Sequence, residues 1–322
     1  RYGIRTRESI YSKELAKDYS KNKLIHKNTL TVGMGSVQIN IGVLTDDITY
    51  SVSPAYHTYK IAGVNAEYLR YCLECRNQDM FSRFVKRGSR QGKTIDLKRW
   101  MTYEIPVYDE NRQQEIVDRL NRISELIEKR QEQLVQLSEL VKSRFIELFG
   151  DSEFNTMQWP TEKLSELCVV SSSKRIYQNE QNTEGVPFLR ISDLNERIDN
   201  VKNAPELFIP INKYNELKEN GLVPTEGDIL VTSRGTLGRC YIVRPEDEFY
   251  FQDGMISWLS DLSHQITSLY LSQLFAMSGI QKQIASLQAG STVAYLSISM
   301  LKKLDIMLPP LNLQNQFAVF VE

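Results

Sequence analysis

Residues 111–149 read NRQQEIVDRLNRISELIEKRQEQLVQLSELVKSRFIELF, and the organisation of the chain follows from this stretch. Its apolar residues recur at alternating steps of four and three, the heptad spacing of a helix that packs along another helix. No Gly or Pro lies inside the stretch, and Gly150 stands where such a helix would stop. The expected packing seam is Ile116, Leu120, Ile123, Ile127, Leu134, Leu137, Val141 and Leu148, interrupted by Arg130 and Arg144.

The stretch therefore predicts one continuous helix, about 55–60 Å long at roughly 1.5 Å per residue. Globular-looking sequence flanks it on both sides. A helix of this length is then either a spacer between two domains or a strut for dimerisation. We expect the exposed seam to find a partner, and the simplest partner is the same helix of a second copy.

The composition is that of an ordinary globular protein. A chain of 322 residues favours two domains, and 41% hydrophobic with 25% charged residues allows each a core. No apolar run of about 18 residues and no signal peptide are visible, and four cysteines are too few for a disulfide framework. We therefore expect a cytoplasmic protein. The net charge of −1 gives no hint of a nucleic-acid partner, so such a hint must come from local patches.

An internal repeat relates the two halves of the chain. Residue n matches residue n+199 at first and n+201 or n+202 later, in the order strand, Gly loop, strand, helix, Gly-Ser loop, strand, helix start. Single helices are expected over 65–84 and 267–288. The matched pairs include Leu30 with Ile229, Val32 with Val231, Tyr59 with Trp258, Tyr68 with Tyr270, Trp100 with Leu301, Ile105 with Ile306, and Gln113 with Gln314.

The repeat predicts a mixed α/β (α+β) fold with two repeated globular domains joined by the long, coiled-coil-forming helix. The first domain covers 1–108, and because the counterpart of 157–200 is absent before it, we expect its N-terminal part to be missing. The long helix covers 109–150 and the second domain 151–309. Residues 310–322 read as the truncated start of a second long helix, so both ends look cut from a longer chain.

Catalytic and metal-binding motifs are missing from the sequence. None of the three histidines has a nucleophile at a recognisable spacing, and His57 is expected to be a packing residue within a strand. Cys72 and Cys75 form a CxxC, but no second pair of ligands follows at zinc spacing, so we expect two buried thiols. We therefore assign no catalytic residue, no metal site and no cofactor to this chain.

A cationic segment lies at 83–99, with seven Lys or Arg residues against the single Asp96. Arg, Gln, Ser and Thr on a glycine-containing loop are the donors that proteins use for phosphates and base edges. A solvated surface would show the same charges. DNA binding is favoured because polar loops stand at equivalent places in the two repeats.

Five segments together resemble the specificity (S) subunit of Type I restriction–modification systems. The resemblance extends over essentially the full chain. The segments are GVPFLRISDL (185–194), EGDILVTSRGTLGRCYIV (226–243), AGSTVAYLSISMLKKLDIMLPPLNLQNQ (289–316), IPVYDENRQQEIVDRLNRISELIEKRQEQL (105–134) and LVKSRFIELFGD (140–151).

The resemblance implies a non-catalytic subunit that reads double-stranded DNA. Each globular part would be a target-recognition domain for one half of a bipartite site, and the long helix would set the spacer and dock methyltransferase (M) subunits. Those subunits would bind S-adenosylmethionine and methylate a flipped adenine, and a restriction/translocase (R) subunit would use ATP and Mg. Two other interpretations stay open: a helix-mediated scaffold without DNA contact, and the recognition segment of a fused restriction–methyltransferase polypeptide.

For this chain we predict two sets of DNA-facing residues. Arginine and glutamine are the expected base readers, and lysine and serine the expected phosphate contacts. The first domain contributes Arg87, Ser89, Arg90, Gln91 and Lys93. The second contributes Lys174, Arg175, Ser233, Arg234, Thr236, Ser291 and Thr292.

Overall fold

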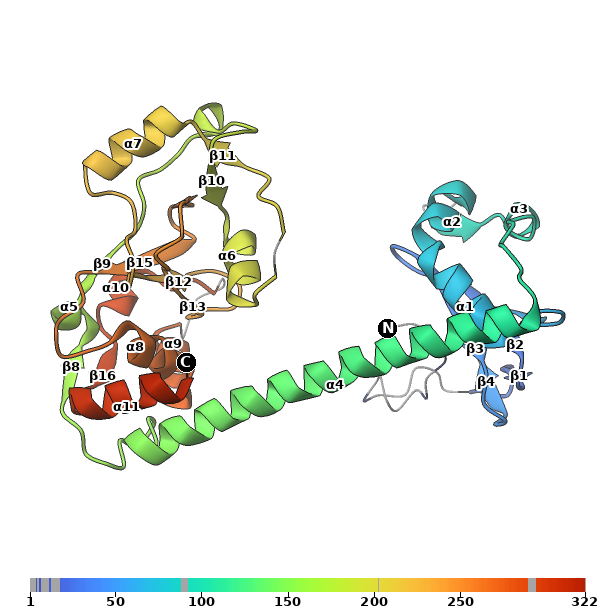
Figure 1. Cartoon of the computed structure of the whole chain (residues 1–322), viewed down its shortest axis with the longest axis horizontal. Coiled ribbons are helices and arrows are strands. Elements are labelled where there is room, and N and C mark those ends of the chain that lie inside the picture. Colours follow the sequence, from blue (N-terminus) through green and yellow to red (C-terminus); the bar gives the residue numbers. More distant parts are fainter. Residues whose placement is uncertain are drawn as a thin grey trace. The chain divides into compact units, whose positions relative to one another are not determined.

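The long helix is present as predicted. The structure, a computed structural model, describes residues 4, 6, 12, 18–87, 92–201, 203–288 and 294–321. It has two compact units, unit 1 (Arg1–Gln133) and unit 2 (Leu134–Glu322). Helix α4 (Glu110–Phe149) begins in the first unit and ends in the second (Figure 1). In the described part of the chain, no helix combines the length and the apolarity needed to span a bilayer.

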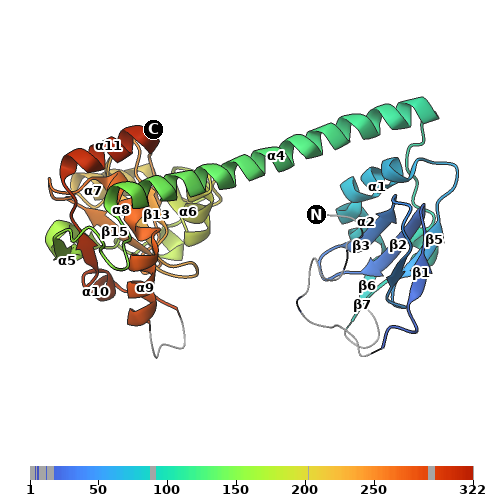
Figure 2. The same cartoon turned by 90° about the horizontal axis from the view of Figure 1, so that it is seen from below.

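Unit 1 is built on a three-stranded antiparallel sheet in the order β3-β2-β5. Two consecutive helices, α1 and α2, pack against β3 (Figure 2), and Val32, Ile39, Met80 and Trp100 lie in the core between them. The elements are β1 (Lys23–Ile25), β2 (Thr29–Met34), β3 (Ile39–Leu44), β4 (Tyr50–Val52), β5 (His57–Lys60), α1 (Ala66–Cys75), α2 (Asn77–Phe84), β6 (Val85–Arg87), β7 (Lys93–Ile95) and α3 (Leu97–Trp100).

Unit 2 has an equivalent sheet with one more strand, in the order β13-β12-β15-β9. A second small sheet, β11-β10-β14, extends this unit. The elements are β8 (Thr161–Lys163), α5 (Leu164–Leu167), β9 (Val169–Ser171), η2 (Gln178–Glu180), β10 (Val186–Leu189), α6 (Ile191–Ile198), β11 (Phe208–Ile209), α7 (Ile211–Glu219), β12 (Ile229–Thr232), β13 (Cys240–Ile242), β14 (Tyr250–Phe251), β15 (Ile256–Ser260), α8 (Ser268–Phe275), α9 (Ser278–Leu287), α10 (Ile298–Leu301), β16 (Asp305–Met307) and α11 (Leu311–Val321).

The internal repeat is confirmed by these elements. Strands β3-β2-β5 and β13-β12-β15 have the same antiparallel pairing, and each set is followed by two helices, a four-residue helix and a helix that starts with a buried glutamine. Gln113 accepts a hydrogen bond from the backbone N–H of Asn65 (2.8 Å), and Gln314 accepts one from that of Thr267 (2.9 Å). Asn65 and Thr267 are the N-caps of α1 and α8. A glutamine at the equivalent position therefore anchors the start of the equivalent helix in each unit.

The predictions of single helices over 65–84 and 267–288 are wrong, because each region holds two helices. In unit 1 the buried Asn77 bonds both backbone groups of Ile39, at 2.9 and 2.8 Å, which ties the start of α2 to β3. In unit 2, Met277 is extended, and Gly279 lies so close to the carbonyl of Ser152 that a Cβ would be 2.2 Å from it. Both breaks come from contacts distant in sequence.

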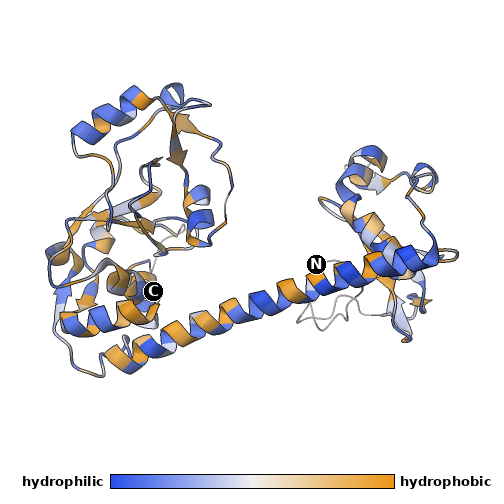
Figure 3. Ribbon diagram, viewed as in Figure 1, coloured by the Kyte–Doolittle hydropathy of each residue, from blue (hydrophilic) through white to orange (hydrophobic). Residues whose placement is uncertain are grey.

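Hydrophobic residues recur along the whole of α4 (Figure 3), but the burial of the predicted seam changes along the helix. Ile116 and Leu120 near its start, and Val141 and Leu148 near its end, are partly buried. The middle four, Ile123, Ile127, Leu134 and Leu137, are exposed, as are Leu126, Val135 and Leu140 beside them. The buried apolar positions of α4, Val117, Phe145 and Phe149, lie outside the predicted seam.

Candidate nucleic-acid interface

The predicted DNA-facing loops of unit 2 converge at one end of its four-stranded sheet. Because β9, β15, β12 and β13 pair antiparallel, the end of β9, the start of β15, the end of β12 and the start of β13 lie at that same end. The loops that leave these strand ends are 172–175, 252–255 and 233–239. The register thus brings together segments that are far apart in the sequence.

Hydrogen bonds to backbone groups join these loops. The hydroxyl of Ser172 donates to the carbonyl of Ile256 (3.0 Å) and accepts from the N–H of Gly254 (3.3 Å). The N–H of Ser233 donates to the carbonyl of Met255 (2.9 Å), and the N–H of Leu296 donates to the carbonyl of Ser233 (3.0 Å). Loops 172–175, 252–256, 233–239 and 294–296 therefore form one connected surface, which we call the loop cluster.

Four predicted residues present their side chains on the loop cluster: Lys174, Arg175, Arg234 and Thr236 are all exposed. The guanidinium of Arg234 lies over the ring of Tyr295 at 5.6 Å, and the two residues also form a backbone β-bridge. Arg175 pairs with Asp253 at 2.8 Å, and this carboxylate raises the pKa of Arg175. Among the described residues, neither Lys174 nor Arg234 has a carboxylate in salt-bridge distance, so their charges are available to a ligand.

The backbone at Lys174 is held by the buried Tyr250. The phenol oxygen accepts from the N–H of Lys174 (2.8 Å) and donates to its carbonyl (3.2 Å). Burial raises the pKa of Tyr250 to about 12, so the phenol stays neutral and can do both. Tyr250 thus fixes the backbone direction from which the Lys174 side chain leaves the surface.

The prediction of Ser233 as a DNA-facing residue is wrong for its side chain. Ser233 is only 1% exposed, and its hydroxyl is hydrogen bonded to that of Ser257 at 2.7 Å. The residue directly follows β12, whose four residues are all buried because both faces of this strand are covered, and the same burial continues at Ser233. Ser291 and Thr292 lie outside the described residues.

A tight turn presents Arg234 and Thr236. Gly235 and Gly238 both have positive φ values, +72° and +76°, which glycine adopts without strain. The hydroxyl of Thr232 donates to the carbonyl of Thr236 (2.6 Å) and accepts from the N–H of Arg239 (2.9 Å), which closes the turn. The motif SRGTLGR is therefore a rigid hairpin tip and no phosphate-binding loop of the kind that ends in GK[ST].

Two residues of the cluster were missed by sequence reasoning, Asp253 and Tyr295. Asp253 pairs with Arg175, and Tyr295 supports Arg234. Their roles depend on contacts between segments that are distant in the sequence. Arg175 and Asp253, for example, are 78 residues apart. The sequence motif AGSTVAYLS contains Tyr295 but gives no sign that it meets Arg234.

In unit 1 the described part of the predicted site is smaller. Lys93 donates to the carbonyl of Ser36 (2.7 Å) and lies over the ring of Phe81 at 5.1 Å. Ser36 belongs to the turn between β2 and β3, the repeat counterpart of the SRGTLG turn. Arg87 ends β6, and its side chain lies outside the described residues, as do Ser89, Arg90 and Gln91. The same two segments thus meet in both units, through Lys93 here and through Arg234 and Tyr295 in unit 2.

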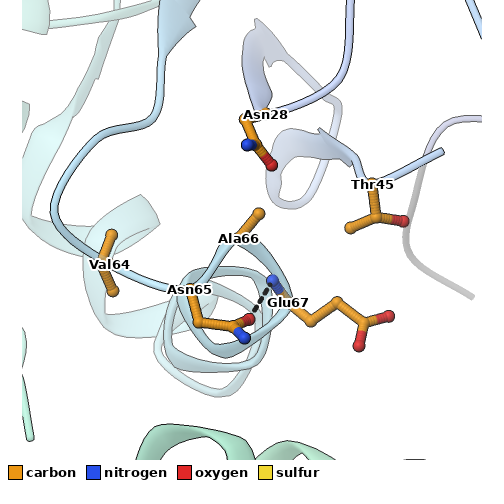
Figure 4. A pocket seen from close by; sticks show the side chains of 6 residues that line it. All are labelled: Asn28, Thr45, Val64, Asn65, Ala66 and Glu67. Atoms are coloured by element: carbon orange, nitrogen blue, oxygen red, sulfur yellow. Dashed lines mark hydrogen bonds between the residues drawn. The ribbon is translucent and has the colours of Figure 1, made fainter. Parts of the chain in front are cut away.

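A pocket of about 350 Å³ in unit 1 lies at the start of α1 (Figure 4). The side chain of Asn65 faces it and accepts from the N–H of Glu67 at 2.9 Å. The carboxylate of Glu67, the one ionisable group of the lining, accepts from Asn121 at 3.1 Å. These contacts serve the helix cap, and we assign the pocket no catalytic role. It is lined by Asn28, Thr45, Val64, Asn65, Ala66 and Glu67.

Two expectations about polar residues in unit 1 are wrong. His57 is exposed on β5, because the edge strand turns this position to solvent. Cys75 is exposed, whereas Cys72 is buried as expected, because they stand three residues apart near the end of α1 and only Cys72 faces the core. In the described ranges, no three His, Cys, Asp or Glu residues come together in a group that could hold a metal ion.

Comparison with known proteins gives a family for both halves. The family described as Type I restriction modification DNA specificity domain matches residues 2–137 and 157–322. A putative type I restriction enzyme specificity subunit, S.HindORF215P of Haemophilus influenzae, is 28% identical over 163 residues, which are 50% of this chain and 38% of the relative. The chain therefore matches less than half the length of this curated relative.

The fold has a counterpart among solved structures. The S subunit of a Type I restriction-modification system from M. genitalium has a TM-score of 0.51 at 16% identity, covering 92% of this chain and 75% of that chain. The HsdS subunit from Thermoanaerobacter tengcongensis has a TM-score of 0.40 at 16% identity, covering 92% and 73%. With two matched regions that together span most of its sequence, this chain belongs to the Type I restriction modification DNA specificity domain family.

Proposed function

We propose that this chain is a non-catalytic specificity subunit that binds double-stranded DNA, with each unit reading one half of a bipartite target. The loop cluster of unit 2 is the observation that supports this most strongly. It gathers Lys174, Arg175, Arg234 and Thr236 at one end of a rigid sheet. Guanidinium, ammonium and hydroxyl donors on a rigid scaffold suit phosphate contacts and direct readout of base edges.

The two sides of the cluster suit different tasks. Lys174 carries a mobile point charge that matches a phosphate. Arg234 rests on Tyr295, which holds the planar guanidinium in one orientation and favours bidentate contact with a guanine. We therefore assign base reading to Arg234 and backbone contact to Lys174.

The partners we propose are two methyltransferase subunits and a restriction/translocase subunit. The methyltransferase subunits would dock on α4 and bring S-adenosylmethionine, and the restriction subunit would bring ATP and Mg. This chain would hold no cofactor of its own and would act in the cytoplasm, where the DNA lies. Family membership supports this division of labour.

We expect Arg234→Ala to weaken binding to a duplex that carries the bipartite target by about 1 kcal/mol, roughly fivefold, because we assign Arg234 to a base. The slope of log K against log salt should also fall by about 1 if Arg234 meets a phosphate, and stay unchanged if it meets a base. Fluorescence anisotropy over a salt series measures both.

Arg244→Ala is the matched control. Arg244 is exposed and lies over Tyr241 at 5.8 Å, as Arg234 lies over Tyr295, but it follows the opposite end of β13. The control removes the same charge and should change affinity less than about twofold. Equal losses in the two variants would mean that only net charge matters, and duplex binding without salt dependence would argue against the proposal.

The bipartite target should appear in the methylated genome of a cell that carries the gene. We expect N6-methyladenine at one bipartite motif to vanish when the gene is deleted and to return when it is restored. Arg234→Ala should lower methylation, or relax the sequence that is required for it, in one half of the motif only, because each unit reads one half. Methylation-sensitive sequencing of the three strains tests this, and an unchanged set of motifs after deletion would contradict it.

We also propose that this chain forms a homodimer through the exposed middle of α4. The seam residues Ile123, Ile127, Leu134 and Leu137 are exposed, and a heptad seam buries such residues against a second helix. Light scattering at about 10 µM should give a dimer, since pairing of the two helices would bury these exposed apolar side chains.

The double variant Leu134→Glu, Leu137→Glu should be monomeric, because it places two carboxylates in the seam. Gln136→Glu is the control, since Gln136 is exposed between them on the outer side of the heptad and adds the same kind of charge. A monomeric wild-type chain at this concentration would count against the homodimer.

A further inference from the structure

One carboxylate lies among the basic side chains of the loop cluster. Asp253 is the single acidic residue of the four loops, which also contain Lys174, Arg175, Arg234 and Arg239. A carboxylate repels the phosphates of a duplex, so it lowers the affinity of a surface that only holds the DNA backbone. The presence of Asp253 is explained if it serves a basic residue that does not bind phosphate.

The carboxylate holds Arg175 by one nitrogen only. The Nε–H of Arg175 donates to Oδ2 of Asp253 at 2.8 Å. In the part of the chain that the structure describes, neither terminal nitrogen of this guanidinium has a hydrogen-bond partner. The side chain of Arg175 is 65% exposed, and that of Asp253 is 22% exposed. The two terminal NH2 groups, which can donate together to O6 and N7 of a guanine, are therefore open to a ligand.

This geometry distinguishes Arg175 from the other paired arginines of unit 2. In the described part of this unit, every other arginine that forms an ion pair uses at least one terminal nitrogen for it. These arginines are Arg144, Arg190, Arg197 and Arg239. Their carboxylate partners occupy nitrogens that a base would need, whereas the partner of Arg175 leaves both terminal nitrogens free.

Hydrogen bonds fix the backbone on both sides of the ion pair. The hydroxyl of Ser173 donates to the carbonyl of Phe251 at 2.7 Å. The N–H of Gln252 donates to the carbonyl of Leu189 at 2.9 Å. The two segments that carry the pair are thus held in place before DNA binds, and the ion pair restricts the guanidinium in turn. Such preorganisation lowers the entropy that binding must cost.

The ion pair also changes what Arg175 attracts. Asp253 balances the charge of Arg175, so a phosphate is attracted less strongly here than at Lys174, which has no carboxylate in salt-bridge distance among the described residues. The two acceptors of a guanine demand two aligned donors, and alignment depends on the orientation of the guanidinium rather than on net charge. The pair therefore suits a base better than the backbone.

We propose that Arg175 reads a guanine in the half-site of unit 2, and that Asp253 is the positioning residue that holds its guanidinium for this contact. Asp253 also weakens binding to other sequences, because its carboxylate repels phosphates wherever no guanine is present to bind Arg175. The inference rests on the proposed DNA-binding function and deepens it. It adds a second base-reading arginine to Arg234 in the same unit.

The first test replaces the gene in its own cell and sequences the methylated genome. Asp253→Asn and Arg175→Lys should each relax one guanine position of the motif, in the same half that Arg234→Ala affects, because all three residues lie in unit 2. Lysine keeps the positive charge but lacks the planar pair of donors. Asp261→Asn is the control, since Asp261 is exposed just after the opposite end of β15 and the variant removes the same charge.

The second test measures binding of the full-length chain to two duplexes. One carries the motif that the wild-type strain methylates, and the other has an A·T pair in place of that G·C pair. The wild type should prefer the first by at least about fivefold. Asp253→Asn should reduce this preference to less than about twofold and bind the second duplex about twofold to threefold more tightly, because a negative charge is gone.

The salt dependence separates positioning from a merely structural role. Without Asp253, Arg175 can turn to a phosphate, so the slope of log K against log salt should become steeper by about 1 in Asp253→Asn. A variant that only damaged the fold would lose affinity for both duplexes and would not gain salt dependence. Asp261→Asn should change the preference and the slope little.

The outcomes distinguish this inference from the function on which it rests. If deletion of the gene removes no methylated motif, the proposed function fails, and the inference fails with it. If a motif is lost on deletion but Asp253→Asn and Arg175→Lys keep every guanine of it, the inference alone is overturned. Equal loss of affinity for both duplexes in Asp253→Asn would also overturn it.

Discussion

Replacing Gln314 by leucine is expected to destabilise unit 2 by about 3–5 kcal/mol. Gln314 is 0% exposed and bonds three backbone groups at 2.9 Å: it accepts from the N–H of Thr267 and donates to the carbonyls of Gln265 and Pro309. Leucine is close in size, so little cavity forms. The three backbone groups lose their partner inside the protein, and each costs roughly 1–3 kcal/mol when left unsatisfied.

The measurement is urea unfolding followed by hydrogen exchange and mass spectrometry, which reports the peptides of each unit separately. Gln316→Leu is the matched control, because Gln316 is an exposed glutamine two residues further along α11 and should change stability by less than about 0.5 kcal/mol. A loss in Gln314→Leu no larger than in this control would show that the glutamine does not fasten α8.

The repeat extends this prediction to the equivalent glutamine of unit 1. Gln113→Leu should destabilise unit 1 by about 2–3 kcal/mol, since Gln113 bonds two backbone groups, the N–H of Asn65 (2.8 Å) and the carbonyl of Tyr108 (2.6 Å). Each variant should lower protection in its own unit. If either substitution lowered hydrogen-exchange protection in both units, it would contradict the claim that each glutamine stabilises only its own unit.

Phe149→Ala is expected to cost about 3–5 kcal/mol in unit 2. Phe149 is 0% exposed, and its ring meets those of Phe145 (4.7 Å), Tyr270 (4.8 Å) and Phe317 (5.6 Å). Truncation removes the buried apolar area and leaves a cavity between three rings that cannot collapse without moving α8 or α11. Thermal or urea unfolding of the variant measures the loss.

Ile146→Ala is the control for the end of α4. Ile146 is exposed three residues before Phe149, so the same kind of truncation on the same helix should cost less than about 1 kcal/mol. Exchange protection should fall in the last turns of α4 and in α8 for Phe149→Ala only. Equal stability of the two variants would mean that the end of α4 is not part of the core of unit 2.

Much of the fold can be predicted from the sequence, because it depends on periodic patterns of residues. The heptad spacing and the absence of Gly and Pro over 111–149 predicted one helix, and the structure has it as α4. The repeat predicted two units with the same strand and helix order, and Gln113 and Gln314 occupy the same place in both. The heptad pattern is set by side chains a few residues apart, and the repeat by comparison of the two halves of the sequence, so neither needs knowledge of tertiary contacts.

The candidate site can be predicted from the sequence only in part, because it depends on tertiary contacts. Polar loops pointed to Lys174, Arg175, Arg234 and Thr236, which are exposed on the loop cluster. The adjacent Ser233 is buried against Ser257, because both faces of β12 are covered up to the end of the strand. Whether a polar residue faces solvent depends on which way a turn leaves its strand, and composition does not report this.

By itself, the sequence determined the long helix, the two repeated units and the kinship of both to DNA specificity domains, since each rests on the order of residues along the chain and needs no knowledge of tertiary contacts. Only the tertiary structure decided where α1 and α8 end, because Asn77 and Gly279 make contacts about 38 and 127 residues away. It also brought Arg234 onto Tyr295 and Arg175 onto Asp253. Strand register does this, because antiparallel pairing places distant loops at one end of a sheet.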